Sequence, residues 1–161
     1  MTNIRPYDPA DAEALAAAYR AAVTGLGPQA YSPEHVAVWA SYPADIEEFR
    51  ARLMRGVTMV AEVAGRPVGF AQLDPLDHVQ FLYVDPAYCR RGFATALYAV
   101  LELFARQSGA AALTTAASRV SRPFFEKMGV AVVEPEHVTW GGLTFERFVM
   151  RKALDENDMA A

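Results

Sequence analysis

The sequence predicts an α/β fold in which helices flank a mixed sheet. Its first part carries apolar residues at helical spacing, and from residue 57 onward strand patterns alternate with helical ones. A long helix between two strands can serve as a parallel crossover, whereas strands joined by short turns pair antiparallel. A chain of 161 residues is the usual size of one domain, so we expect a single domain, with 155–161 as a frayed tail.

The N-terminal third predicts a short strand and three helices. Ile4–Tyr7 can begin the sheet, and in the following YDPADAEALAAAYRAAV we expect Asp8 to cap a helix that starts at Pro9. Ser32 repeats this start signal before PEHVAVWA. The third helix, PADIEEFRARLMRG, has apolar residues on one side and is expected to end at Gly56.

The rest of the chain predicts six strands and two helices. VTMVAEVAGRPVGFAQL reads as two strands around an Ala64-Gly65 turn, and HVQFLYV as a third. A helix from Gly92 to about Ser108 follows. AALTTAA is then a buried strand, SRPFFEKMG a short helix ending at Gly129, and VAVVE and TFERFVMRKA the last two strands, with WGG in their turn.

Composition and charge exclude several classes of protein. A net charge of −4 argues against a nucleic-acid surface that relies on broad positive charge. No uncharged apolar stretch approaches the roughly 20 residues of a membrane span, and the N-terminus does not resemble a signal peptide. The single cysteine, Cys89, allows no intrachain disulfide. We therefore expect a cytoplasmic protein without nucleic-acid or membrane partners. The three histidines lack metal-ligand spacing, which predicts no metal.

The junction CRRGFA, between a predicted strand and a predicted helix, has the features of an anion site. A helix N-terminus presents unpaired N–H groups and partial positive charge. Gly92 lets the backbone approach an anion, Ala94 keeps the next turn slim, and Arg90 and Arg91 can add charge-assisted hydrogen bonds. A pyrophosphate is the expected ligand.

Four segments in this order, FLYVDPAY, CRRGFA, TALYAVLELFA and SRPFFEKMGV, resemble the GNAT superfamily of N-acyltransferases over residues 4 to 152. The family pattern Gln/Arg-x-x-Gly-x-Gly/Ala corresponds here to Cys89 through Ala94. Both small residues match, whereas Cys89 replaces the usual Gln or Arg. The resemblance implies a mostly antiparallel sheet of six or seven strands, splayed between its central strands, and an N-acetyltransferase that moves an acetyl group from acetyl-CoA to a primary amine by direct attack.

The resemblance also implies where acetyl-CoA binds. Its pantetheine arm is expected in a slot between a bulged strand and the strand around Leu113 to Ala117, with the pyrophosphate on the arginine-glycine loop. The expected acetyl-CoA-binding residues are Leu82, Tyr83, Val84, Arg90, Arg91, Gly92, Phe93, Ala94, Thr95, Ser118, Phe124, Phe125 and Lys127.

For catalysis, the resemblance implies an oxyanion donor from the strand backbone, the N–H of Tyr83 or Val84. Candidate bases are His78, Asp77 and Glu134. His78 has a suitable intrinsic pKa, and we expect His78 or Asp77 to assist through water. An ordered water chain without any side-chain base is the alternative.

The usual acid of the family is absent. Many relatives have a tyrosine where this chain has Phe125, and an asparagine where it has Ser118. Phe125 is therefore expected to pack against the cofactor. Tyr88 and Tyr98 remain alternative hydroxyls. A nucleophilic role for Cys89 would need a nearby histidine with an orienting partner, and no sequence signature supports one.

Two segments, GLGPQAYSPEHVAVWASYP and EPEHVTWGG, are expected to wall the acceptor side. Residues that can line an apolar acceptor pocket are Tyr31, Trp39, Tyr42 and Trp140, and residues that can attract a cationic amine are Glu34, Glu134 and Glu136. The acceptor is expected to be a small-molecule or peptide amine.

The sequence leaves two other functions open. One is a non-catalytic domain that binds or senses acyl-CoA, which the lack of an acid at Phe125 favours. The other is a plain nucleotide-binding α/β protein, although RRGFATA lacks the glycine and lysine patterns of the dinucleotide and P-loop motifs. A homodimer is also expected, because exposed ends of such sheets often pair.

Overall fold

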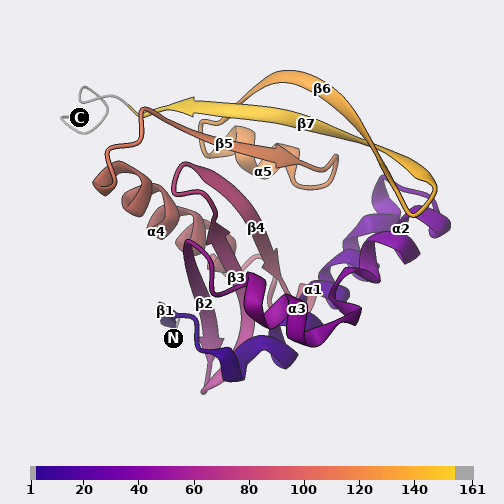
Figure 1. Cartoon of the computed structure of the whole chain (residues 1–161), viewed down its shortest axis with the longest axis horizontal. Coiled ribbons are helices and arrows are strands. Elements are labelled where there is room, and N and C mark those ends of the chain that lie inside the picture. The colour runs from indigo at the N-terminus through magenta and orange to yellow at the C-terminus, as the bar shows by residue number, and fades with distance from the viewer. Residues whose placement is uncertain (1–2, 155–161) are drawn as a thin grey trace.

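Seven strands form one mixed sheet in the order β1-β2-β3-β4-β5-β7-β6 in the computed structural model, which describes residues 3–154 (Figure 1). Every neighbouring pair is antiparallel except β4 and β5, which run parallel. The mixed, mostly antiparallel α/β fold predicted from the sequence is therefore confirmed. The tail expected over 155–161 lies outside the described residues.

The elements follow the predicted order. The strands are β1 (Asn3–Pro6), β2 (Val57–Val63), β3 (Arg66–Leu73), β4 (His78–Val84), β5 (Ala112–Ala117), β6 (Ala131–Trp140) and β7 (Leu143–Ala153). The helices are α1 (Ala12–Leu26), α2 (Pro33–Ala40), α3 (Ile46–Arg52), α4 (Phe93–Gln107) and α5 (Arg122–Lys127). No helix within 3–154 is long and apolar enough to cross a membrane.

One strand differs from its prediction. β6 was expected to end near Glu134, but it continues to Trp140, so that only Gly141 and Gly142 form the turn to β7. The expectation that this strand ends near Glu134 is therefore wrong, because residues 134–140 of EPEHVTWGG belong to β6. The longer strand contains Pro135, although proline cannot donate to a sheet ladder. β6 is an edge strand, where a missing donor is tolerated.

Helices cover the two faces of the sheet and bury a separate core on each. On one face, α4 packs Leu97 and Leu101 against Ala71 and Leu113 of the sheet. On the other face, α1, α2 and α3 surround a cluster rich in aromatic side chains, which includes Tyr19, Phe49, Phe70 and Phe81. The helical spacing of apolar residues predicted these contacts.

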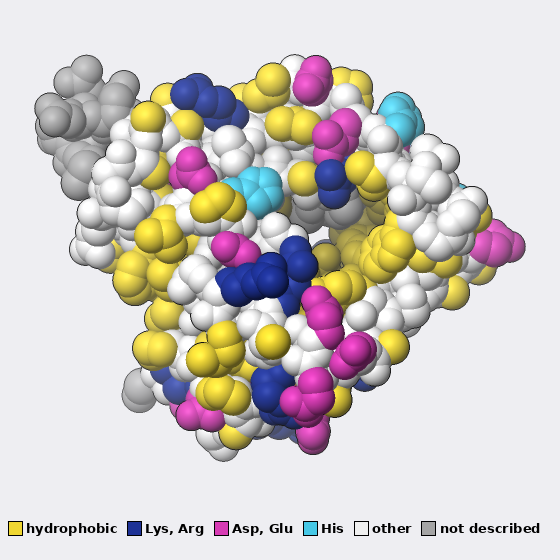
Figure 2. All heavy atoms as spheres, in the orientation of Figure 1, with side chains coloured by type: hydrophobic (Ala, Val, Ile, Leu, Met, Phe, Trp, Pro, Cys, Tyr) yellow, Lys and Arg dark blue, Asp and Glu magenta, His cyan; other side chains and the backbone are white. Residues whose placement is uncertain are grey.

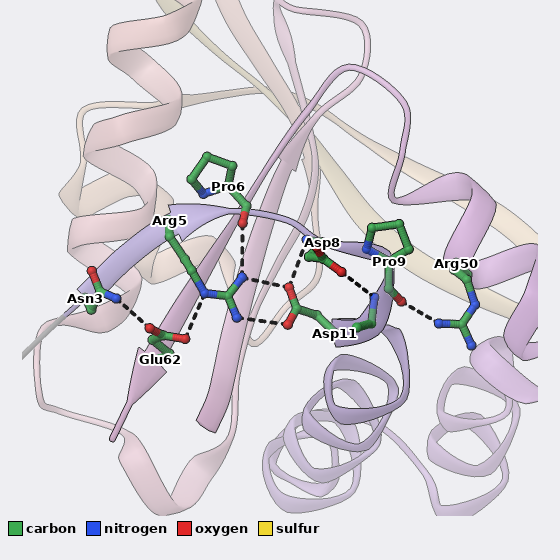
Figure 3. Close-up of polar contacts among 9 residues, drawn as sticks. Asn3, Arg5, Pro6, Asp8, Pro9, Asp11, Arg50 and Glu62 are labelled. Carbon is green, nitrogen blue, oxygen red and sulfur yellow. Dashed lines mark hydrogen bonds and ion pairs between the residues drawn. The ribbon is translucent and has the colours of Figure 1, made fainter. Parts of the chain in front are cut away.

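A polar network ties β1 to the start of α1 (Figure 3). The guanidinium of Arg5 donates two hydrogen bonds to the carboxylate of Asp11, at 2.8 and 2.9 Å, and a third to Glu62 at 2.8 Å. Asp8, as predicted, caps the turn before α1 by accepting from the N–H of Ala10. Asp11 in turn accepts from the N–H of Asp8 at 2.9 Å, which completes a capping box.

Asp11 is buried, with 7% of its surface exposed. Burial alone would raise the pKa of Asp11, but the hydrogen bonds from Arg5 and from the N–H of Asp8 hold this pKa below its ordinary value. The ionised carboxylate therefore stabilises the folded chain at neutral pH.

We predict that Asp11→Asn lowers the free energy of unfolding by about 2–3 kcal/mol at pH 7, because it removes the charge from a partly buried bidentate pair. Since the native pKa of Asp11 is depressed, this stabilisation exists above the unfolded value of about 3.9 and is lost as the pH falls through the lower native value. Urea unfolding at pH 7 and pH 3 measures the difference. Equal differences at both pH values would contradict the role of the charge.

Candidate functional site

The sheet opens between β4 and β5, as predicted. These strands pair only through His78 with Thr114 and Val79 with Thr115, and then diverge. The register of β3 with β4 jumps at the same place, so that Gln80 is an extra residue in a β-bulge. The bulge bends β4 away from β5. Between them lies a cavity of about 500 Å³, and Figure 2 shows a hollow lined by hydrophobic side chains there.

Two backbone N–H groups of β4, those of Leu82 and Val84, face this opening, as the hydrogen bonds of their neighbours show. The N–H of Asp85 donates to the carbonyl of Val68 on the β3 side at 2.8 Å. Because N–H directions alternate along a strand, the N–H of Tyr83 also points to β3, where Tyr83 is paired with Phe70. The N–H groups of Leu82 and Val84 point the other way. Of the two oxyanion donors expected from the sequence, Val84 is thus the one directed into the slot.

The loop before α4 has the geometry of an anion site. Gly92 has a φ of 83°, and a Cβ added there would meet no atom within 4 Å, so the space above it is open. The first hydrogen bond of the helix runs from the N–H of Ala96 to the carbonyl of Gly92, at 3.0 Å. The N–H groups of Phe93, Ala94 and Thr95 precede it and have no helical partner. These donors fit a pyrophosphate.

Arg90 and Arg91 flank these donors and are exposed. Arg90 has a φ of 61°, a left-handed conformation that turns the chain toward α4. The Arg91 guanidinium lies over the rings of Tyr88 and Phe93, at 5.4 and 5.7 Å. Neither arginine has an ion pair within the part of the chain that the structure describes. Both are therefore free to bind an anion.

The start of α5 forms another wall of the cavity. Phe124, buried Phe125 and Ser118 line it, whereas Lys127 is exposed and lies outside it. The hydroxyl of Ser118 accepts from the N–H of Ser121 at 3.1 Å.

The alternative hydroxyls of Tyr88 and Tyr98 lie outside the cavity lining. Tyr98 donates instead to Glu102 at 2.8 Å, and burial, followed by this contact, raises the pKa of Tyr98. Neither tyrosine is placed to serve a reaction in the cavity.

The opposite end of the cavity is aromatic. Its side chains include Tyr19, Tyr31, Trp39, Tyr42, Tyr83, Trp140 and Phe145. The Trp39 ring N–H donates to the hydroxyl of Tyr83 at 3.3 Å. Burial raises the pKa of Tyr83 to about 12, so this hydroxyl is protonated at neutral pH. The structure thus brings together the four aromatic residues expected at the acceptor side, Tyr31, Trp39, Tyr42 and Trp140. The acidic residues expected with them are not there: Glu34 and Glu134 are exposed and do not line the cavity.

His78 lies in a second cavity, of about 470 Å³, on the side of β7 and β6. This cavity shares lining residues with the first: Val79, Gln80, Thr115, Ala116 and Arg147. Nδ1 of His78 is 2.8 Å from the hydroxyl of Thr114. Burial lowers the pKa of His78, partly opposed by Asp77, which favours the neutral ring at neutral pH.

Asp77 is exposed and lines neither cavity. Glu136 lines the second cavity, where it forms an ion pair with Arg147. Among residues 3–154, no group of three His, Cys, Asp or Glu side chains is arranged to hold a metal ion.

Sequence reasoning missed several contributors to the cavity, among them Tyr19, the Tyr83 side chain and Arg52. The sequence analysis assigned Tyr19 no role in the site and expected only backbone groups from Tyr83, yet both side chains line the aromatic end. Arg52, at the end of α3, lines the same end. Only the packing of α1 and α3 against β4 brings these side chains together, so no local pattern could have found them.

Comparison with known proteins places these features in context. The family model described as "Acetyltransferase (GNAT) domain" matches residues 28–152. The chain is 36% identical over 150 residues to the uncharacterized N-acetyltransferase YafP of Escherichia coli K12, covering 92% of this chain and 94% of YafP.

Solved structures show the same architecture. A GCN5-related N-acetyltransferase from Rhodopseudomonas palustris matches with a TM-score of 0.93 at 38% identity, over 96% of both chains. The PaiA N-acetyltransferase from Thermoplasma acidophilum, solved in complex with coenzyme A, matches with a TM-score of 0.77 at 20% identity, over 96% of this chain and 99% of that one.

The Tyr31 hydroxyl bridges the aromatic end of the cavity. It donates to the carbonyl of Glu146 and accepts from the N–H of Arg119, both at 3.0 Å. We expect Tyr31→Phe to lower the free energy of unfolding by about 1–2 kcal/mol, because two backbone groups lose their partner. Tyr7→Phe is the control, since the Tyr7 hydroxyl makes one long bond of 3.3 Å. Equal losses in urea unfolding would argue against the bridge.

Proposed function

We propose, because the chain belongs to the GNAT family of acetyltransferases, that it transfers an acetyl group from acetyl-CoA to a primary amine by direct attack. The observation that carries this proposal is the continuous cavity between β4 and β5. It runs from Ala94 at the start of α4, past the slot-facing backbone of β4, to the aromatic residues of α1, α2 and β7. One end suits a phosphate-bearing donor and the other a separate acceptor.

The chain's own groups fit coenzyme A, which the solved PaiA protein contains. The N–H groups at the start of α4, with Arg90 and Arg91, would hold the pyrophosphate. The outward backbone groups of Leu82 and Val84 would bind the pantetheine arm much as an added strand does. When bound, acetyl-CoA supplies an activated acetyl thioester. Phe124 and Phe125 offer an apolar contact beside it.

The backbone of β4 would stabilise the charge that develops during transfer. The N–H of Val84 points into the slot and can donate to the oxygen that gains negative charge. No strong side-chain acid is needed for the thiolate, because it is a good leaving group near neutral pH. This accounts for a phenylalanine, Phe125, where many relatives have a tyrosine.

His78 is the proposed base, acting through water. Its ring lies in the second cavity, which adjoins the first along Val79, Gln80 and Ala116. The Thr114 hydroxyl, which lies 2.8 Å from Nδ1, holds the ring in place. In the tautomer with the proton on Nδ1, Nε2 is free to accept a proton. The proposal for Asp77 is weaker, because that side chain is exposed away from both cavities.

The proposal first requires acetyl-CoA binding. At a hundredfold excess over the dissociation constant, one site adds about 2.7 kcal/mol of stability, which raises the midpoint of a domain this size by roughly 5–10 °C. NADH and ATP serve as controls. Gly92→Ala should weaken binding at least about tenfold, because it strains the backbone where the phosphates would lie.

Gly109→Ala is the matched control for that variant. Gly109 also has a φ of 83° with no atom within 4 Å of an added Cβ, but it lies beyond the other end of α4. Calorimetry should find its affinity for acetyl-CoA unchanged. An equal loss in both variants, or no midpoint shift with acetyl-CoA, would contradict the proposed site. Binding without transfer to any amine would instead favour a non-catalytic acyl-CoA domain.

A second prediction concerns the base. Because the pKa of His78 is lowered, the ring is already neutral at the ordinary histidine pKa of about 6.5. As the pH decreases, kcat/KM should therefore stay constant down to about pH 6.5 and decline only at more acidic pH. His78→Ala should lower kcat about 10- to 100-fold and remove that acidic limb. Asp77→Asn is the control: it should keep kcat and the acidic limb, with the limb moved to lower pH because the charge of Asp77 raises the pKa of His78. An unchanged pH profile in His78→Ala would exclude His78 as the base.

Two further expectations stay predictions. A cytoplasmic location and a homodimer were inferred from the sequence, and each calls for its own measurement.

A further inference from the structure

We infer that the acceptor amine carries a carboxylate, which Arg52 binds at the aromatic end of the cavity. This inference rests on the proposed function, since it names the chemical class of the acceptor for the same site. Basic side chains border the hollow in Figure 2. The charged groups of the cavity differ in whether they already have a partner.

Three charged residues line the first cavity, and two of them are neutralised. Glu146 forms an ion pair with Arg119 at 3.0 Å, and Arg147 forms one with Glu136. Arg52 has no ion pair and no side-chain hydrogen bond within the described part of the chain. Glu48 lies four residues earlier on α3, but no ion pair joins the two. Of the three charged residues that line this cavity, Arg52 is thus the one without an ion pair.

Buried donors near Arg52 also lack partners. Its Nε atom is buried and makes no hydrogen bond, and the hydroxyl of Tyr42, which lines the same cavity, is buried without a hydrogen bond too. An unpaired buried donor costs free energy that an acceptor oxygen would recover. Burial, and after it the nearby carboxylate of Glu48, raises the pKa of Tyr42 against the opposing charge of Arg52, so that the hydroxyl keeps its proton at neutral pH.

The position of Arg52 is fixed by its surroundings rather than by an acid. Its guanidinium lies 5.8 Å from the centre of the Phe81 ring, an attractive contact for a cation. Its backbone carbonyl accepts from the side-chain amide of Gln72 at 2.8 Å. The planar guanidinium is therefore held at the cavity with donors available, the arrangement that favours a carboxylate.

The rest of the lining defines the acceptor further. The aromatic residues around Arg52 suit an apolar body between amine and carboxylate. No carboxylate free of an ion pair lines this cavity within residues 3–154, so a polycationic acceptor would find no counter-charge. An apolar amine with one carboxylate, of the kind that hydrophobic amino acids represent, fits both features.

The experiment measures binding without any transfer of acetyl. The chain has two tryptophans, Trp39 and Trp140, and both line the cavity, so their fluorescence reports its occupancy. The probes are 3-phenylpropionate and its uncharged amide. We expect the wild type to bind the carboxylate about 10- to 100-fold more tightly than the amide. Arg52→Gln should remove this preference, and Arg52→Lys should keep part of it.

Arg55→Gln is the matched control. The carbonyl of Arg55 also accepts from Gln72, at 3.0 Å, but the Arg55 side chain is exposed and does not line the cavity. Arg55→Gln should retain the wild-type preference for the carboxylate. If Arg52→Gln fails to fold, Arg52→Lys still tests the inference. Equal binding of acid and amide, an undiminished preference in Arg52→Gln, or binding of neither probe would overturn the inference.

Acetyl-CoA titrations separate this inference from the proposed function. If acetyl-CoA stabilises the wild type but the carboxylate shows no preference, the inference fails and the proposed function stands. If the carboxylate binds through Arg52 and acetyl-CoA does not bind, the proposed function fails and the site remains a carboxylate pocket.

Discussion

The partial pairing of β4 with β5 is the constraint on which the rest of this structure depends. The two strands share a sheet, yet they pair at only two positions before the bulge at Gln80 bends β4 away. Backbone groups that leave a ladder need other partners, because unpaired N–H and C=O groups cost free energy when buried. Water or a ligand backbone can supply those partners. The gap in the sheet therefore creates both a cavity and a strip of donors and acceptors along its wall.

Contacts across the gap keep it from widening further. The hydroxyl of Tyr31 and Nε2 of His35 bind backbone atoms of β7, at 3.0 and 2.9 Å, and so join the α2 region to the far half of the sheet. The sequence connection is distant, but Figure 1 shows α2 beside the turn of β6 and β7. One end of the cavity is thereby closed by aromatic side chains, while the other remains open at the start of α4.

The two ends of the cavity use different parts of the chain. At the start of α4 and along β4 the useful groups are backbone N–H groups, which depend on geometry and tolerate side-chain changes such as Cys89 or Phe125. At the aromatic end the polar groups that line the cavity belong to side chains, Arg52 and Tyr42 among them. In such an arrangement the site for the acetyl donor can stay the same while the site for the amine acceptor changes, because substitutions at the aromatic end leave the backbone of β4 in place.

The sequence by itself determined the order of elements and the family, and it predicted an anion site at Gly92, because these depend on local spacing: helical and strand periods, caps, and a glycine at a helix start. It also predicted four of the residues at the aromatic end of the cavity, Tyr31, Trp39, Tyr42 and Trp140. It did not determine the length of β6, the direction of the Tyr83 N–H or the pairing of Glu136 with Arg147, since each depends on which strand lies beside it. Only the tertiary structure brought Arg52 to Phe81 and left it without a carboxylate partner. Charge compensation is a property of neighbours in space, and the chain order does not record those neighbours.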